Sequence, residues 1–132
     1  MTHPNEKLIR DVFAAFAAGD LDGILQRCTD DVLFRIPGSG RTAGEYRGRE
    51  AFLGDLVTRL PQVADMSTFT ETIEAAACDD DHGVLLATQS FTRLDGRAHT
   101  YRIIAVLSFR DGLLSEFDER AGDPAEFDAA WS

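Results

Sequence analysis

Residues 82–119 constrain the fold more than any other stretch, because they contain three consecutive strand patterns joined by two Asp-Gly pairs. Asp95-Gly96 and Asp111-Gly112 each lie between runs rich in Val, Ile, Phe, Tyr and Thr. An Asp-Gly pair in this setting is the strongest short-range signal for a β-hairpin. The stretch therefore predicts a three-stranded antiparallel meander.

The middle strand of this meander is apolar on both faces. Alternation places one row of side chains, headed by His99, toward a core or pocket: Tyr101, Ile103, Ala105, Leu107 and Phe109. Ile104 and Val106 lie on the other face and need a cover of their own, either helices of the chain or a partner subunit. We expect a homodimer through this second face, with Leu85 and Phe91 also in the interface.

The first turn sets the pairing of the first two strands. If Asp95-Gly96 is a two-residue turn, Leu94 pairs with Arg97. Counting outward then pairs Thr92 with His99, Ser90 with Tyr101 and Thr88 with Ile103. Under this register, Thr88 and Ser90 share the face of the long apolar row.

The second turn leaves two registers open. A two-residue loop pairs Arg110 with Leu113 and turns Asp118 toward the pocket. A three-residue loop with Gly112 left-handed pairs Phe109 with Leu113 and turns Phe117 and Glu119 inward instead. One residue of register thus decides which carboxylate is buried.

Length and charge restrict the class of protein and its partners. A chain of 132 residues fits a single domain, residues 1–132, with a sizeable core. The net charge of −10 argues against nucleic acid or an anionic membrane, since these polyanions would be repelled. A small neutral or apolar molecule fits this chain better.

The cysteines, histidines and N-terminus carry few signals. Cys28 and Cys78 lack short spacing and are expected as reduced thiols of a cytoplasmic protein, with a disulfide as the alternative. The three histidines lack ligand spacing, so no metal site is expected. No leader-like segment and no span of about 20 apolar residues is evident.

Helical and strand spacing outline the rest of the chain. Three helices are predicted in the first half, over about residues 5–18, from Leu21 to Cys28 behind an Asp20 cap, and from Gly48 to Leu60. Strands are predicted over residues 32–36 and 65–77, and a last helical turn after Asp123-Pro124 has Phe127 and Trp131 covering an open end. This order predicts an α+β fold, a cone-shaped, curved, mixed or antiparallel sheet around three helices with a pocket inside.

Several short motifs then resemble a known family. They are Gly19-Asp20-Leu21, Asp30-Asp31-Val32, Ile36-Pro37-Gly38, Tyr46-Arg47-Gly48-Arg49-Glu50, Asp111-Gly112-Leu113-Leu114, Asp118-Glu119 and Asp123-Pro124. Their order and spacing resemble the nuclear transport factor 2-like superfamily, and more narrowly its SnoaL-like, ketosteroid-isomerase-like branch. The resemblance implies a cone-shaped pocket for small apolar molecules, usually in dimers, without metal or cofactor. It also implies reactions such as double-bond isomerisation, polyketide cyclisation, epoxide hydrolysis and dehydration.

The same resemblance argues against steroid isomerisation by the usual mechanism. The position of the general-base Asp falls on Ile36, and the two oxyanion-hole positions fall on Val12 and Ala105. None of these three side chains can exchange or donate a proton.

The alignment implied by the resemblance turns Phe117 and Glu119 inward and sets Glu119 opposite Ile103. Desolvation there would raise the pKa of the Glu119 carboxyl toward values useful for proton transfer. We therefore expect Glu119 as general acid or base, or Asp118 in the shifted register. The expected binding residues are Phe16, Phe34, Ile36, Tyr46, Phe52, Leu56, Thr88, Ser90, His99, Tyr101, Ile103 and Phe117.

The sequence allows two interpretations of Glu119 and, correspondingly, two functions of the domain. Glu119 is either catalytic or a structural carboxylate paired with Arg102, Arg120 or a helix N-terminus. The domain is correspondingly an acid/base enzyme or a non-catalytic domain for ligand binding or dimerisation. The direction in which the Asp118 and Glu119 side chains point distinguishes the enzyme from the non-catalytic domain.

Overall fold

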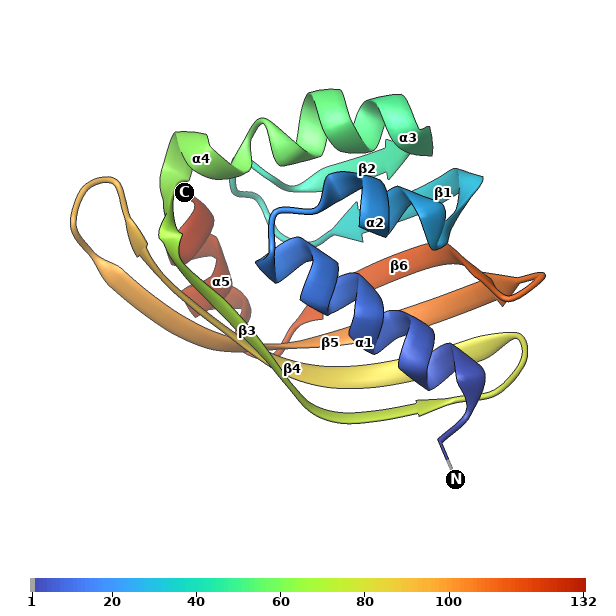
Figure 1. The fold of residues 1–132 in the computed structure, drawn as a ribbon. Helices are drawn as coiled ribbons and strands as arrows, with labels where there is room; N and C mark the ends of the chain where they lie inside the picture. Colours follow the sequence, from blue (N-terminus) through green and yellow to red (C-terminus); the bar gives the residue numbers. More distant parts are fainter. Residues whose placement is uncertain (1) are drawn as a thin grey trace.

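The computed structural model describes residues 2–132 as one curved sheet with α1 and α2 packed inside its curve (Figure 1). The strand order across the sheet is β2-β1-β6-β5-β4-β3. Neighbours run antiparallel except β1 and β6, which are parallel. The strands are β1 (Cys28–Ile36), β2 (Gly44–Arg47), β3 (Ala64–Cys78), β4 (His82–Arg93), β5 (Ala98–Arg110) and β6 (Leu113–Ala121). The predicted α+β class, with its curved mixed sheet, is confirmed.

The helices are α1 (Pro4–Ala17), α2 (Leu21–Gln26), α3 (Gly48–Ala51), the π-helical segment η1 (Phe52–Val57), α4 (Leu60–Val63) and α5 (Pro124–Trp131). The first and last helices lie within one or two residues of their predicted positions. Asp20 caps α2 as expected, since its side chain accepts a hydrogen bond from the Gly23 amide. The predicted third helix is divided instead, and Pro61 lies in the first turn of α4, where its missing N–H costs little.

The beginning of β1 differs from the prediction. Cys28 was expected on the second helix, but it begins β1 and pairs with Leu114 of β6. The amide of Leu114 also donates a hydrogen bond to the Arg27 carbonyl. Pairing with β6 therefore extends the strand through Asp30 and Asp31, which local composition alone marks as a turn. The short strand β2, which pairs with β1, was not predicted.

The first hairpin has a longer loop than the predicted two-residue turn. The Arg93 amide donates to the Arg97 carbonyl, and Gly96 has a φ of 92°, so three residues form the loop. The predicted register is therefore wrong by one residue: Tyr101 pairs with Gln89. Because side chains alternate, Thr88 and Ser90 lie on the outer face, and Gln89 and Phe91 point inward.

This register also changes the expected dimer face. Leu85 and Phe91 are each 2% exposed and belong to the core, so they do not contribute to the outer face. Val84, Ile104 and Val106 are the exposed apolar residues there.

The second hairpin combines features of both registers that the sequence left open. Asp111 and Gly112 both have positive φ and form a two-residue turn that pairs Arg110 with Leu113. A bulge follows, because Phe109 pairs with Leu114 and Ser108 with Glu116, which leaves Ser115 as the extra residue. The bulge reverses the alternation, so Phe117 and Glu119 face inward. Glu119 lies opposite Ala105 rather than Ile103, which was the expected neighbour.

Candidate functional site

A cavity of about 110 Å³ lies between the concave face of the sheet and the helices that cover it. Its wall is largely aromatic and aliphatic. The polar side chains in the wall are those of Thr42, Glu71, Gln89 and Glu119. The apolar ones are Val12, Phe13, Phe16, Ile24, Phe34, Ile36, Phe52, Leu56, Val57, Leu60, Phe69, Phe117, Phe127 and Trp131.

Glu119 of β6 is 6% exposed and lines this cavity. Within residues 2–132, no hydrogen bond or ion pair reaches its carboxyl group. Burial, with a further contribution from the charge of Glu71, raises the pKa of Glu119 to about 8. A carboxyl in this setting is neutral at neutral pH and can donate a proton.

Glu71 of β3 lies at the partly buried end of a chain of hydrogen bonds that begins in the core. The indole Nε1–H of Trp131 donates to the Tyr101 hydroxyl (2.8 Å), which donates to Gln89 Oε1 (2.6 Å). Gln89 Nε2 donates in turn to Glu71 Oε2 (2.6 Å). Burial raises the pKa of Glu71 to about 7, and the hydrogen bond from Gln89 opposes that rise.

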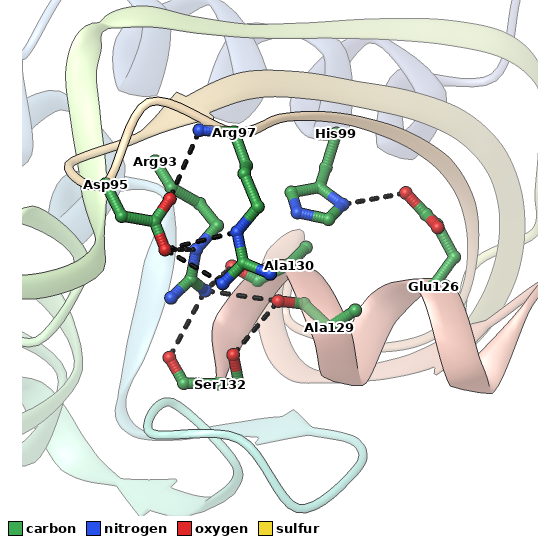
Figure 2. A network of polar contacts seen from close by, with 8 residues as sticks. All are labelled: Arg93, Asp95, Arg97, His99, Glu126, Ala129, Ala130 and Ser132. Carbon is green, nitrogen blue, oxygen red and sulfur yellow. Dashed lines mark hydrogen bonds and ion pairs between the residues drawn. The ribbon is translucent and has the colours of Figure 1, made fainter.

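Helix α5 closes one end of the cavity with Phe127 and Trp131. Figure 2 shows Arg93 at the carboxyl end of α5. Its Nη1 donates hydrogen bonds there to the carbonyls of Ala129 (3.1 Å), Ala130 (2.7 Å) and Ser132 (3.2 Å). A cation is favourable at this end of a helix. The helix that completes the wall is thereby fixed to the β4–β5 hairpin.

The structure brings seven of the predicted site residues to the cavity wall. These are Phe16, Phe34, Ile36, Phe52, Leu56, Phe117 and Glu119. Three others are buried beside it: Tyr101 in the hydrogen-bond chain, Ile103 in the core, and Tyr46, whose hydroxyl donates to the Thr42 carbonyl.

Four predicted residues do not face the cavity. Thr88 and Ser90 lie on the outer face. The Thr88 hydroxyl donates a hydrogen bond to the Glu74 carboxylate, and the hydroxyls of Ser90 and Thr100 are hydrogen-bonded to each other. His99 Nδ1 lies 2.8 Å from Glu126 Oε1 of α5 (Figure 2). Asp118 accepts two hydrogen bonds from the Arg120 guanidinium, which lower its pKa, so the bulge has directed it away from the cavity.

Glu71 and Gln89 were missed as site residues, although part of the signal was present. Glu71 lies on the same side of its strand as Phe69 and Ile73, and a carboxyl on an apolar face is an informative exception. Gln89 had no such signal, because the predicted register placed it outside.

Neither a metal site nor a membrane-crossing helix is evident in the described part of the chain. Residues 2–132 contain no group of three or more His, Cys, Asp or Glu residues that could hold a metal ion. Across the same residues, every helix is too short or too polar to cross a bilayer.

The fold and the cavity together define a cone-shaped α+β domain with a small apolar pocket and acidic groups in its wall. The family profile of the SnoaL-like domain matches residues 9–117, and the chain belongs to this family. An uncharacterised protein of Mycobacterium tuberculosis is 30% identical over 128 residues, which are 95% of this chain and 94% of that protein.

Solved structures with the same fold support this assignment. An NTF2-like protein of unknown function from Burkholderia pseudomallei has a TM-score of 0.88 at 21% identity, over 99% of both chains. A candidate polyketide cyclase of Xanthomonas campestris has a TM-score of 0.74 at 17% identity, over 98% of this chain and 97% of that one. The predicted resemblance to the SnoaL-like, nuclear transport factor 2-like proteins is therefore confirmed.

Proposed function

We propose that this protein is an acid/base catalyst for a small, neutral, mostly apolar molecule that carries a carbonyl or hydroxyl group. The observation that carries the proposal is the Glu119 carboxyl, which is buried in an apolar cavity wall and has no hydrogen-bond partner among residues 2–132. Isomerisation, aldol cyclisation, dehydration and epoxide hydrolysis all need such a proton donor or acceptor. The structural likeness to a candidate polyketide cyclase agrees with this group of reactions.

The size and charge of the cavity narrow the ligand. A volume of about 110 Å³ is comparable to apolar cavities of about 150 Å³ that hold benzene, so we propose a single-ring compound. Among the residues that the structure describes, the wall contains carboxyl groups and no Arg, Lys or His side chain, so a negatively charged ligand would find no counter-ion there. A neutral ligand is therefore favoured.

Hydrogen–deuterium exchange at the α-carbons of cyclohexanone in D₂O tests the proposed chemistry, with NMR as the readout. The wild-type protein should accelerate the exchange, and Glu119→Gln should lower the catalysed rate by about 100-fold or more, because it keeps the shape but removes the proton. Asp118→Asn is the control and should retain the rate, since Asp118 pairs with Arg120 outside the cavity.

The alternative, a non-catalytic binding domain, gives a different result in this assay. Binding of cyclohexanone without exchange above the buffer rate would contradict acid/base catalysis and favour that alternative. An equal loss of rate in the Asp118 and Glu119 variants would also contradict the proposed role of Glu119.

We propose further that the protein is a homodimer through the outer face of β4 and β5. Val84 (51% exposed), Ile104 (44%) and Val106 (41%) are close together there, since Val84 pairs with Val106 across the two strands. Burying such a patch against a second copy would remove apolar surface from water.

Sedimentation equilibrium at micromolar concentration tests this interface. We expect a dimer for the wild type and a monomer for the double variant Ile104→Glu, Val106→Glu, which places charges in the patch. Leu94→Glu, at the exposed tip of the β4–β5 hairpin, is the control and should remain a dimer. A monomeric wild-type protein would contradict the proposal.

The state of the cysteines supports a cytoplasmic location, which we also propose. Cys28 is buried and Cys78 is partly buried, and both are free thiols. Burial raises the pKa of Cys28 to about 11, so its thiol is protonated at neutral pH. Unpaired thiols of this kind are usual in a reducing compartment.

A further inference from the structure

We infer that Glu71 and Glu119 act as one catalytic pair, in which Glu71 is the carboxylate that removes a proton and Glu119 is the neutral acid that donates one. Both side chains line the same cavity, Glu71 from β3 and Glu119 from β6. This inference rests on the proposed acid/base function. It adds a second catalytic residue and assigns each carboxyl a role.

The hydrogen-bond chain fixes the role of Glu71. An indole N–H can only donate, so Trp131 occupies an acceptor position of the Tyr101 hydroxyl and directs the hydroxyl proton to Gln89 Oε1. The amide group of Gln89 is thereby oriented with its Nε2 donors toward Glu71. Glu71 therefore accepts a hydrogen bond from the protein, and this hydrogen bond favours the ionised form of its carboxyl group.

Glu119 has the opposite environment. Among residues 2–132, its carboxyl has neither a hydrogen-bond donor nor a cation, and an isolated buried carboxylate is costly. Elements α1, α2, η1 and α5 contribute only apolar side chains to the cavity wall, so Glu71 is the other carboxyl group in that wall. Tyr101 of β5 lies near both carboxyl groups, and Glu119 also borders a second hollow whose charged residues are Arg35, Glu45, Asp118 and Arg120. Of all these groups, the charge of Glu71 is the one that shifts the pKa of Glu119. The charge on Glu71 disfavours a second charge nearby, and Glu119 keeps its proton.

This division of roles supports a balanced proton transfer to a bound ketone. Glu71 takes a proton from the carbon beside the carbonyl, and the C–H electron pair forms the new C=C bond. The C=O π pair moves to oxygen, which takes the proton of Glu119, and an enol forms. Glu71 is then neutral and Glu119 ionised, so the pair keeps a total charge of −1 throughout and no additional charge is buried.

Titration of the glutamate side-chain carboxyl carbons by ¹³C NMR, without any ligand, tests the assignment. Resonances are assigned by their loss in Glu71→Gln and Glu119→Gln. We expect Glu71 to ionise near pH 7 and Glu119 near pH 8. Glu71→Gln should lower the midpoint of Glu119, because the repelling charge is gone, and Gln89→Leu should raise that of Glu71, because its donor is gone.

Different results separate this inference from the proposed function. Ionisation of Glu119 before Glu71, or of both near pH 4, would overturn the pair, and so would an unchanged Glu119 midpoint in Glu71→Gln. The expected titration in a protein that does not exchange cyclohexanone would support the division of protonation but contradict catalysis. Exchange that is retained in Glu71→Gln and lost in Glu119→Gln would remove Glu71 from the mechanism and leave the proposed function intact.

Discussion

Glu119→Gln is expected to raise the free energy of unfolding by roughly 3 kcal/mol at pH 7 and by roughly 4 to 5 kcal/mol above pH 8. The pKa of Glu119 is about 8 in the folded protein, against 4.5 for an unperturbed glutamate. Above pH 4.5 the unfolded chain releases this proton while the folded protein retains it. Stability from the neutral carboxyl is therefore complete below pH 4.5 and falls as the pH rises through 8.

Denaturant unfolding at several pH values checks this prediction. The difference between Glu119→Gln and wild type should vanish below pH 4.5, grow through neutral pH and level off above pH 8. Glu50→Gln, at an exposed position in α3, is the matched control and should change the stability by less than about 0.5 kcal/mol. A difference that does not depend on pH would show that the Glu119 carboxyl is solvated in the folded protein.

The expected gain in stability accompanies the expected loss of exchange activity. A buried ionisable group at a site of proton transfer costs folding free energy, and removing it commonly stabilises a protein at the expense of function. A gain in stability with a loss of rate in the same variant would therefore mark Glu119 as functional, because a structural ion pair would lose stability on substitution.

Tyr101→Phe is expected to lower the free energy of unfolding by roughly 2 to 4 kcal/mol, because it leaves two buried polar groups without partners. The Tyr101 hydroxyl accepts from Trp131 Nε1 and donates to Gln89 Oε1, and both neighbours are nearly inaccessible to water. Trp131 is the single tryptophan of the chain, so its fluorescence reports on this position directly. The emission should change along with the stability.

Tyr46→Phe provides the comparison for this second prediction. The Tyr46 hydroxyl is also hydrogen-bonded twice, to the Thr42 carbonyl and to Arg59 Nη1, whereas Trp131 Nε1 is hydrogen-bonded to Tyr101. Its loss should reduce stability and leave the tryptophan emission unchanged. Identical emission in wild type and Tyr101→Phe would contradict the hydrogen bond between Tyr101 and Trp131.

The second hairpin shows how far local sequence determines the site. Asp111-Gly112 predicts a turn, and alternation then offers either Asp118 or Glu119 to the interior. The turn has two residues, which by itself would select Asp118, and the bulge at Ser115 then selects Glu119. A bulge of this kind has no strong sequence signal, so local patterns identify both candidates without choosing between them.

The first hairpin shows the same limit, because its local sequence predicts one register and the structure has another. A loop one residue longer than predicted exchanges Ser90 for Gln89 on the inner face, and with Gln89 comes its hydrogen bond to Glu71. The apolar side of β3 places Phe69 and Glu71 together, yet it does not show what lies opposite them. The second carboxyl of the proposed pair depends on strand register, which local propensity determines poorly.

The sequence by itself determined the α+β class, the three-stranded meander, the first and last helices and Glu119 as one of two candidate acids. These features follow from side-chain periodicity, turn chemistry and helix capping, all of which act between residues close in the chain. Only the tertiary structure decided the register of both hairpins, the position of Glu71 and the closure of the cavity by α5. Each of these depends on contacts between distant segments, such as Trp131 with Tyr101 and Arg93 with the end of α5, where packing and burial outweigh local preference.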